Sequence, residues 1–256
     1  MEVNIIMIGN TGDIEFVSFI ETIIDLLEEK NLLKEENKEP LMSALYSLSM
    51  VSQEKPMIVA NLKKIILDFK IYRLDLSGHK LGKTNLSGLD LSWCNFENIQ
   101  LSHANLEKIN LSYSNLNGAN MAGANLRYAI FLSSQLNKAN FRGANLKNAN
   151  FEYADLREVR MGTANLHSAK FLKADLTGAR FHGSDLRDAN FNYSNLSGAN
   201  FNSSTLNGAS FENANIEGAD FTNCTGLSVE KIKKAEFVSP ILFPSNIKNK
   251  SFHETF

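Results

Sequence analysis

One feature constrains this chain more than any other. From Leu76 to Phe221, every fifth residue is Leu, Phe, Met or Ile, without a gap or a frame shift. An α-helix repeats every 3.6 residues and a strand every two, so neither element produces a period of five. A fixed period kept over such a length indicates identical units that stack on their neighbours. The sequence therefore predicts a solenoid.

Two further patterns keep the register of the large residue. A small residue, mostly Ala, stands two places before it, and Asn or Asp stands between them, as in Ala144, Asn145 and Leu146. Residues two apart share a face in an extended chain, so Ala and Leu point inward and Asn points outward. The two remaining residues are rich in Gly, Asn and Ser, which favour turns. We expect each repeat to be a short extended piece followed by a turn.

The large residues also indicate how many sides one coil has. Between Leu126 and Phe221, Phe or Met alternates with Leu or Ile, and strict alternation requires an even number of sides. Columns in steps of twenty are the most uniform, and one consists of Leu86, Leu106, Leu126, Leu146, Leu166, Leu186 and Leu206. Four sides and twenty residues per coil fit best. Leu then faces Leu and Phe faces Phe, which keeps the volume of each layer similar.

This pattern resembles the pentapeptide repeat family, whose motif A(D/N)LXX is met in ANLRY (124–128), ANLKN (144–148) and ADLTG (174–178). The resemblance covers residues 74–223. It implies a mainly β fold, a right-handed parallel quadrilateral β-helix. At a strand spacing of roughly 4.8 Å, this solenoid would have about 7.5 coils and a length of roughly 36 Å.

The ends of a solenoid expose apolar layers and open edges, so both need caps. We expect three parts: an N-terminal α-helical domain over 1–73, the β-helix over 74–223, and a C-terminal capping helix and tail over 224–256. Helical periodicity within 13–69 supports the first part. The capping helix is expected at 227–237, opened by Ser228, and the tail at 238–256.

Charge and hydropathy exclude several classes of protein. Net charge is −2, so we expect no nucleic acid partner, which would require a basic excess. No apolar run approaches the roughly 18 residues of a membrane span. The start, MEVNIIMIGNTGD, lacks the basic region of a secretory signal. We expect a cytoplasmic protein. The resemblance also allows a bacterial effector, because some intracellular pathogens send such proteins into host cells.

The two cysteines, Cys94 and Cys224, fall in the inward small-residue columns. They are separated by roughly 31 Å if each coil adds one strand spacing. A disulfide requires a far shorter distance, so we interpret both as small buried residues.

The sequence contains few residue patterns typical of phosphate, metal or catalytic sites. GNTGD (9–13) follows an apolar run but lacks the Gly-Lys-Ser/Thr ending of a phosphate loop. The histidines fall in separate columns and suggest no metal site, and no Ser-His-Asp or Cys-His set shares a neighbourhood. A filled rod also lacks the concave site that catalysis usually needs. We expect no enzyme, cofactor, metal or small-molecule substrate.

One outer face is more apolar than the others. It holds the only tryptophan, three of the six tyrosines and several aliphatic residues; we call this set the aromatic face: Trp93, Tyr113, Ile130, Leu132, Tyr153, Leu172 and Tyr193. Exposed aromatic side chains are favoured anchors for a protein partner or a second copy of the chain. Two alternatives stay open: the rings stabilise neighbouring coils as a ladder, or the helical domain covers them.

A second candidate surface lies a quarter-turn away, in a column that we call the basic column: Arg127, Lys147, His167 and Arg187. The opposite side carries a weak acidic patch of Asp155, Asp175 and Glu158. Stacked like charges repel, so the basic column is a candidate site for an anionic partner. The alternative is an ordinary solvated row.

Two functions follow as hypotheses. The first is a non-enzymatic scaffold for protein–protein interaction, presenting the aromatic face of a rigid rod. The second is implied by the resemblance: some family members mimic DNA, bind type II topoisomerases such as gyrase, and protect against gyrase poisons. That activity goes with an acidic rod, often with loops between coils. Here residues 74–223 carry no net charge and no insertion, which disfavours the second hypothesis.

Overall fold

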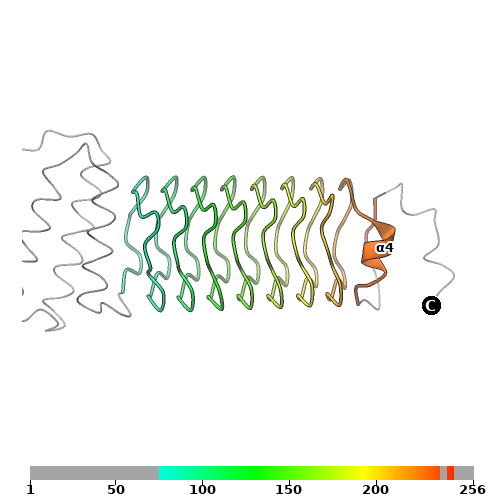
Figure 1. Ribbon diagram of the computed structural model, residues 1–256, viewed down its shortest axis with the longest axis horizontal. Helices are drawn as coiled ribbons and strands as arrows, with labels where there is room; N and C mark the ends of the chain where they lie inside the picture. Colours follow the sequence, from blue (N-terminus) through cyan, green and yellow to red (C-terminus); the bar gives the residue numbers. More distant parts are fainter. Residues whose placement is uncertain (1–74, 237–240, 245–256) are drawn as a thin grey trace, which may run out of the picture.

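The computed structural model of the protein describes residues 75–236 and 241–244. From residue 75 the chain winds into coils that stack along one axis as a rod (Figure 1). Parallel bridges join each residue that precedes a large apolar residue to the residue twenty places further on, from Asp75 with Asn95 to Thr205 with Thr225. Twenty residues therefore make one coil, with four sides of five residues, as the columns predicted.

Every backbone N–H of a typical repeat has its own acceptor, as the repeat Ala144–Asn148 shows. The amide of Ala144 donates to the Phe141 oxygen at 3.0 Å and closes a turn. The amides of Leu146 and Asn148 donate to the next coil, and that of Asn145 to the previous one. The fifth amide, of Lys147, donates to the Asn145 side chain at 3.4 Å. The Asn side chain of the motif therefore supplies the acceptor for one backbone amide of each typical repeat.

The turns depend on the last residue of each repeat, which has positive φ in every repeat that ends between residues 78 and 223. Turns with a left-handed third residue normally take Gly or Asn there. Gly118 follows that rule with φ of 68°, and a Cβ there would collide with Asn98. Many repeats nevertheless place Lys, Ser or Tyr in this conformation. The outer corners of the rod thus carry side chains at some conformational cost.

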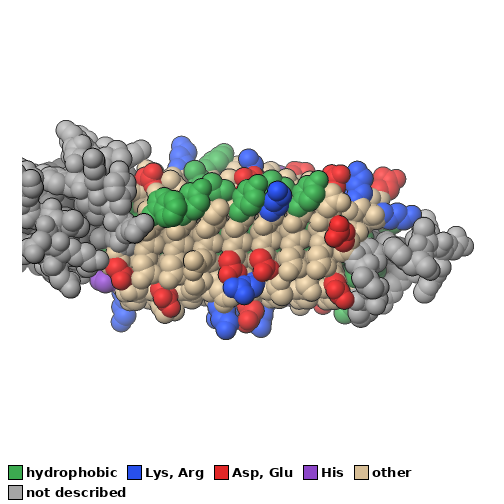
Figure 2. All heavy atoms as spheres, turned by 90° about the horizontal axis from the view of Figure 1, so that it is seen from below, with side chains coloured by type: hydrophobic (Ala, Val, Ile, Leu, Met, Phe, Trp, Pro, Cys, Tyr) green, Lys and Arg blue, Asp and Glu red, His purple; other side chains and the backbone are tan. Residues whose placement is uncertain are grey.

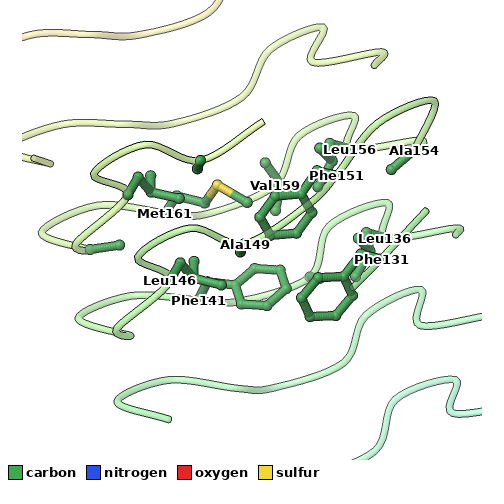
Figure 3. Close-up of a cluster of buried hydrophobic side chains, with 14 of the residues drawn as sticks. Phe131, Leu136, Phe141, Leu146, Ala149, Phe151, Ala154, Leu156, Val159 and Met161 are labelled. Atoms are coloured by element: carbon green, nitrogen blue, oxygen red, sulfur yellow. The ribbon is translucent and has the colours of Figure 1, made fainter. Parts of the chain in front are cut away.

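The interior is filled by two inward columns on each side. The Ala and Leu/Phe positions are buried along the rod, with exposed fractions of a few per cent at most, except His79 in the first coil, which is half-buried. Phe131, Phe151 and Phe171 stack in successive coils with centroids 4.7 and 5.1 Å apart. From the opposite side, Phe141 meets Phe131 edge-on at 5.7 Å, and the two rings face each other across the core in Figure 3. Phe therefore faces Phe, as expected.

The C-terminal end of the rod is covered by a short cap. Its helix, α4, spans Val229–Ile232 and follows Ser228, whose side chain makes no capping bond. Ile232 is buried, and the chain beyond α4 adds bridges from Glu236 to Asn215 and from Leu242 to Asp220. The helix expected over 227–237 is thus a single turn. Paired edges at this end leave less backbone open to end-to-end association.

The other two expected segments lie wholly or mostly outside the described residues. The N-terminal helical domain over 1–73 lies outside the described residues. So does the tail over 238–256, except residues 241–244, where the Phe243 ring stacks on Phe221 with centroids 6.3 Å apart.

Candidate functional site

The aromatic face forms one stripe along the rod. Figure 2 shows apolar side chains gathered in a row parallel to the long axis, with a basic side chain lying on it. Trp93, Tyr113, Tyr153 and Tyr193 are 45–53% exposed, and Ile130 is 38% exposed, whereas Leu132 and Leu172 are half-buried. The structure therefore brings all seven predicted residues to one face. Tyr128, which the prediction omitted, lies at its adjoining corner and is 42% exposed.

Contacts within the aromatic face are uneven. Trp93 and Tyr113 stack with centroids 4.3 Å apart and planes 11° from parallel. The Lys173 ammonium lies 5.5 Å from the Tyr153 ring centroid, in a cation–π arrangement. Tyr193 has no ring or cation contact among the described residues. A continuous aromatic ladder, one of the alternatives for this face, is thus limited to its first two rings.

Every tyrosine in the described residues, and the tryptophan, stands at the left-handed turn position, with φ between 58° and 65°. Bulky side chains are disfavoured there, and Gly or Asn would serve the turn better. Local backbone stability therefore does not explain why these aromatic residues occur at the corner.

The basic column is less charged than its residue types suggest. The Arg187 guanidinium pairs with Asp185 at 2.7 Å and holds the pKa of that carboxyl below its usual value through this hydrogen bond. His167 Nδ1 lies 3.0 Å from the Arg187 carbonyl oxygen, to which an N–H at that position donates, and 3.8 Å from Asp188. Arg127 lies over the Tyr128 ring. Lys147 completes the column, so the structure aligns the four residues but neutralises part of their charge.

The acidic patch is also paired. Arg157 donates from Nε and Nη2 to the two carboxylate oxygens of Asp155, at 2.8 and 2.6 Å. Its Nε also lies 3.9 Å from Asp175. Hydrogen bonding from Arg157 lowers the pKa of Asp155, more than burial raises it.

The coiled core and its motif can be compared with known families. One pentapeptide repeat profile, described as pentapeptide repeats (8 copies), matches residues 73–107 and 104–143. A second, described as pentapeptide repeat region, matches residues 126–201 and 164–237. Together they cover more than half of the chain. The chain belongs to the pentapeptide repeat family.

Solved structures of pentapeptide repeat proteins resemble the rod. HetL, described as involved in heterocyst differentiation regulation in the cyanobacterium Nostoc sp. strain PCC 7120, is 24% identical, with a TM-score of 0.42, over 68% of this chain and 91% of its own. Full-length QnrB1, described as a plasmid-mediated fluoroquinolone resistance protein, is 17% identical, with a TM-score of 0.32, over 66% and 93%. Rfr23 of the cyanobacterium Cyanothece 51142 is 16% identical, with a TM-score of 0.32, over 72% and 99%. No curated protein matches the sequence.

Several repeats of this pentapeptide repeat protein have another residue in the place of the motif's Asn or Asp: Lys80, Gln100, Ile130, Gln135, Arg160, Lys170, Arg180, Thr205 and Ser210. Arg160 and Arg180 are the two arginines among them, and they lie in consecutive coils on the side opposite the aromatic face. With Arg142 and His182 on the same side they form a group that we call the cationic cluster, in which all four residues are exposed. Within the described part of the chain, none of the four side chains has an ion pair or hydrogen bond. The signal in the sequence was the interrupted Asn column.

Other reactive groups are scattered. Cys94 and Cys224 are buried and free, and burial raises the pKa of Cys224 to about 12. Among residues 75–236 and 241–244, no three His, Cys, Asp or Glu side chains gather closely enough to hold a metal ion. The same residues contain no helix long and apolar enough to cross a membrane.

Proposed function

We propose that this pentapeptide repeat protein is a non-enzymatic scaffold that binds a protein partner through its aromatic face. The supporting observation is the placement of large exposed apolar side chains: apart from Leu242, all those in the described residues lie on this face or at its Tyr128 corner. Exposed tyrosine and tryptophan gathered in one stripe are the residue types that dominate protein interfaces.

The stripe has the form of an interface core with polar surroundings. Across one coil, Tyr128, Ile130 and Leu132 place apolar side chains over the whole width of the face. The large rings continue from there in both directions along the rod. Because the backbone of the rod is held by hydrogen bonds between coils, little conformational entropy is lost when a partner docks on it. A rigid row of aromatic anchors suits an extended surface on another protein.

The test replaces two anchors that have few neighbours. Tyr153→Ser with Tyr193→Ser removes two exposed rings and leaves the core untouched. Each anchor is expected to contribute about 2 kcal/mol or more, so affinity for the partner should fall more than roughly 100-fold. The measurement is affinity capture with the intact chain, with quantitative binding of the identified partner, and light scattering to detect a homodimer.

A matched control replaces residues at the same turn position on another face. Lys138→Ser with Asn98→Ser should leave binding and thermal unfolding unchanged. Survival of binding in the tyrosine variant would remove the aromatic face from the proposal. If no second protein is captured and the tyrosine variant loses a homodimer that the wild type forms, the partner is another copy of the chain.

The alternative, a DNA mimic that binds gyrase, is not favoured by the charge pattern. A mimic needs unpaired negative charge along its length, whereas Asp155 and Asp185 are held by arginines and the opposite side of the aromatic face carries the cationic cluster. A supercoiling assay with gyrase and a gyrase poison decides between the two functions. We expect neither inhibition nor protection by this protein.

A further inference from the structure

Several turn amides have no acceptor among the described residues, including those of Gly82, Ser102, Leu132 and Leu172, and two of them lie within the cationic cluster. In nearly every repeat with Asn or Asp before the large residue, that side chain accepts from the amide two places on; Asn125 is the exception. In the repeat of Arg160 four amides are bonded, but the Gly162 amide has no acceptor among the described residues. The repeat of Arg180 leaves the amide of His182 open in the same way.

These open amides point away from the core. In the capped repeats the acceptor is the outward side chain of Asn or Asp, so the amide two places on is directed outward too. Gly162 and His182 occupy equivalent places in consecutive coils. Their amides therefore lie side by side, about one strand spacing or 4.8 Å apart. Two adjacent outward donors can both be contacted by one anion that carries several oxygens.

The side chains around these amides carry the matching charge. Arg160 and Arg180 are bridge partners in consecutive coils. Arg142 and His182 flank Gly162 along the neighbouring column, so the residue without a side chain stands at the centre. Glu158 is at the adjoining corner and makes no ion pair with the cluster within the described residues. Three guanidinium groups thus surround an open patch of backbone donors.

Like charges stacked at strand spacing repel each other, and the two outward amides have no protein acceptor among the described residues. A ligand with several negatively charged oxygens relieves the repulsion and accepts from these amides in place of the missing Asn side chains. Arginine is the residue best suited to bind phosphate oxygens in pairs. We propose that the cationic cluster is a binding site for a phosphate monoester.

The extent of the site favours one phosphate group over a polyanion. Along the column of Arg160 and Arg180, the neighbours on either side are Asn140 and Asn200, whose oxygens cap their own turns. The next lysines on this side, Lys80 and Lys83, are about four coils or 19 Å from Arg160, with His103 between them and the cluster. Lys138 stands at the adjoining corner, one coil before Glu158. A nucleic acid would contact many phosphates in a row, which this face does not offer.

The test restores the missing caps. Arg160→Asn with Arg180→Asn gives both repeats the residue that Asn140 and Asn200 show to be compatible with the fold. Inorganic phosphate is titrated at constant ionic strength, with chloride as the reference, while the amide signals of Gly162 and His182 are followed by NMR. The wild-type chain should show saturable shifts at these two amides. In the variant, affinity should fall at least tenfold.

The matched control, Arg157→Asn with Arg187→Asn, removes the same charge from two arginines that are already paired. Its phosphate affinity should stay within about twofold of the wild type, since distant charges are screened at physiological salt. Absence of saturable shifts in the wild type would overturn the proposal. Equal loss of binding in the control would do so too, because it would indicate general electrostatic attraction.

Two further probes identify the carrier of the phosphate. A short phosphoserine peptide and glycerol phosphate are each tested in competition with inorganic phosphate. Tighter binding of the peptide assigns the site to a phosphorylated protein, and tighter binding of glycerol phosphate to a small molecule. If neither ester competes, the assignment to a monoester is wrong. None of these readouts depends on the aromatic face.

Discussion

The aromatic face and the cationic cluster lie on opposite sides of the rod and share one backbone. Phe131 precedes Leu132 on one side, Phe141 precedes Arg142 on the other, and the two rings meet inside at 5.7 Å. On the aromatic face the unusual residues stand at the left-handed corner of the turn. In the cationic cluster they replace the Asn that caps it. The comparison teaches that each position of the repeat can be varied outward without disturbing the core.

The largest effect on stability should come from a substitution in the core, which supports both faces. Phe171→Ala removes a ring stacked between Phe151 and Phe191, at 5.1 and 4.8 Å. A cavity in this closely packed column should lower the free energy of unfolding by about 3–5 kcal/mol. Urea unfolding of the purified chain measures it. A loss below about 1 kcal/mol would mean that the stack does not support the coils.

The next largest effect on stability should come from restoring the Asn side chains that accept from the turn amides. Arg160→Asn with Arg180→Asn adds two turn hydrogen bonds, each worth about 0.5–1.5 kcal/mol, and removes a repulsion between neighbouring arginines. We expect the free energy of unfolding to rise by about 1–2 kcal/mol. Arg142→Asn is the control, because Asn140 already caps that turn at 3.2 Å. A decrease in stability would show that these arginines stabilise the fold, contrary to our account.

A smaller effect should distinguish the stacked and unstacked rings of the aromatic face. Tyr193→Gly removes a ring without ring contacts and relaxes a backbone with φ of 60°, so stability should be unchanged or rise by up to about 1 kcal/mol. Tyr113→Gly also loses the stack on Trp93, worth about 0.5–1.5 kcal/mol. Thermal unfolding of the two variants compares them. Equal changes in stability of the two variants would mean that the stack of Tyr113 on Trp93 does not stabilise the fold, contrary to this distinction.

The smallest effect concerns pH. Because Arg157 lowers the pKa of Asp155, the pair stabilises the fold above the unfolded-state pKa of about 4 and loses this contribution as pH falls through the folded-state pKa. Arg157→Gln should therefore lower the free energy of unfolding only slightly at neutral pH, as for exposed pairs. The difference from the wild type should vanish in acid. Urea unfolding across the acid range measures it, and a difference that persists in acid would contradict this pairing.

The sequence predicted the interior well because burial depends on period alone. Once five residues per side and four sides are set, Leu146 or Phe151 has only one direction in which to point. The same register aligned the aromatic face correctly. Side-chain pairing could not be predicted in this way. Whether Arg187 reaches Asp185, or Lys173 lies over Tyr153, depends on rotamers that a column pattern does not contain.

The cationic cluster was missed for a different reason. The sequence patterns that predict this fold are those that repeats share, whereas this cluster arises where the usual Asn or Asp is replaced by Arg160 and Arg180. Arg160 is noticeable only when the Asn before it in the column, Asn140, is known to accept from a backbone amide. That role follows from the hydrogen bonds of the coil and not from the residue types.

A crossed binding experiment tests most directly the central claim that one rigid core carries two independent surfaces. The captured protein partner and inorganic phosphate are each titrated against the wild type, Tyr153→Ser with Tyr193→Ser, and Arg160→Asn with Arg180→Asn. The account predicts that each double substitution abolishes binding of one ligand and leaves the other within about twofold, as expected for distant sites without shared contacts. Loss of both ligands in either variant, with thermal unfolding unchanged, would contradict it.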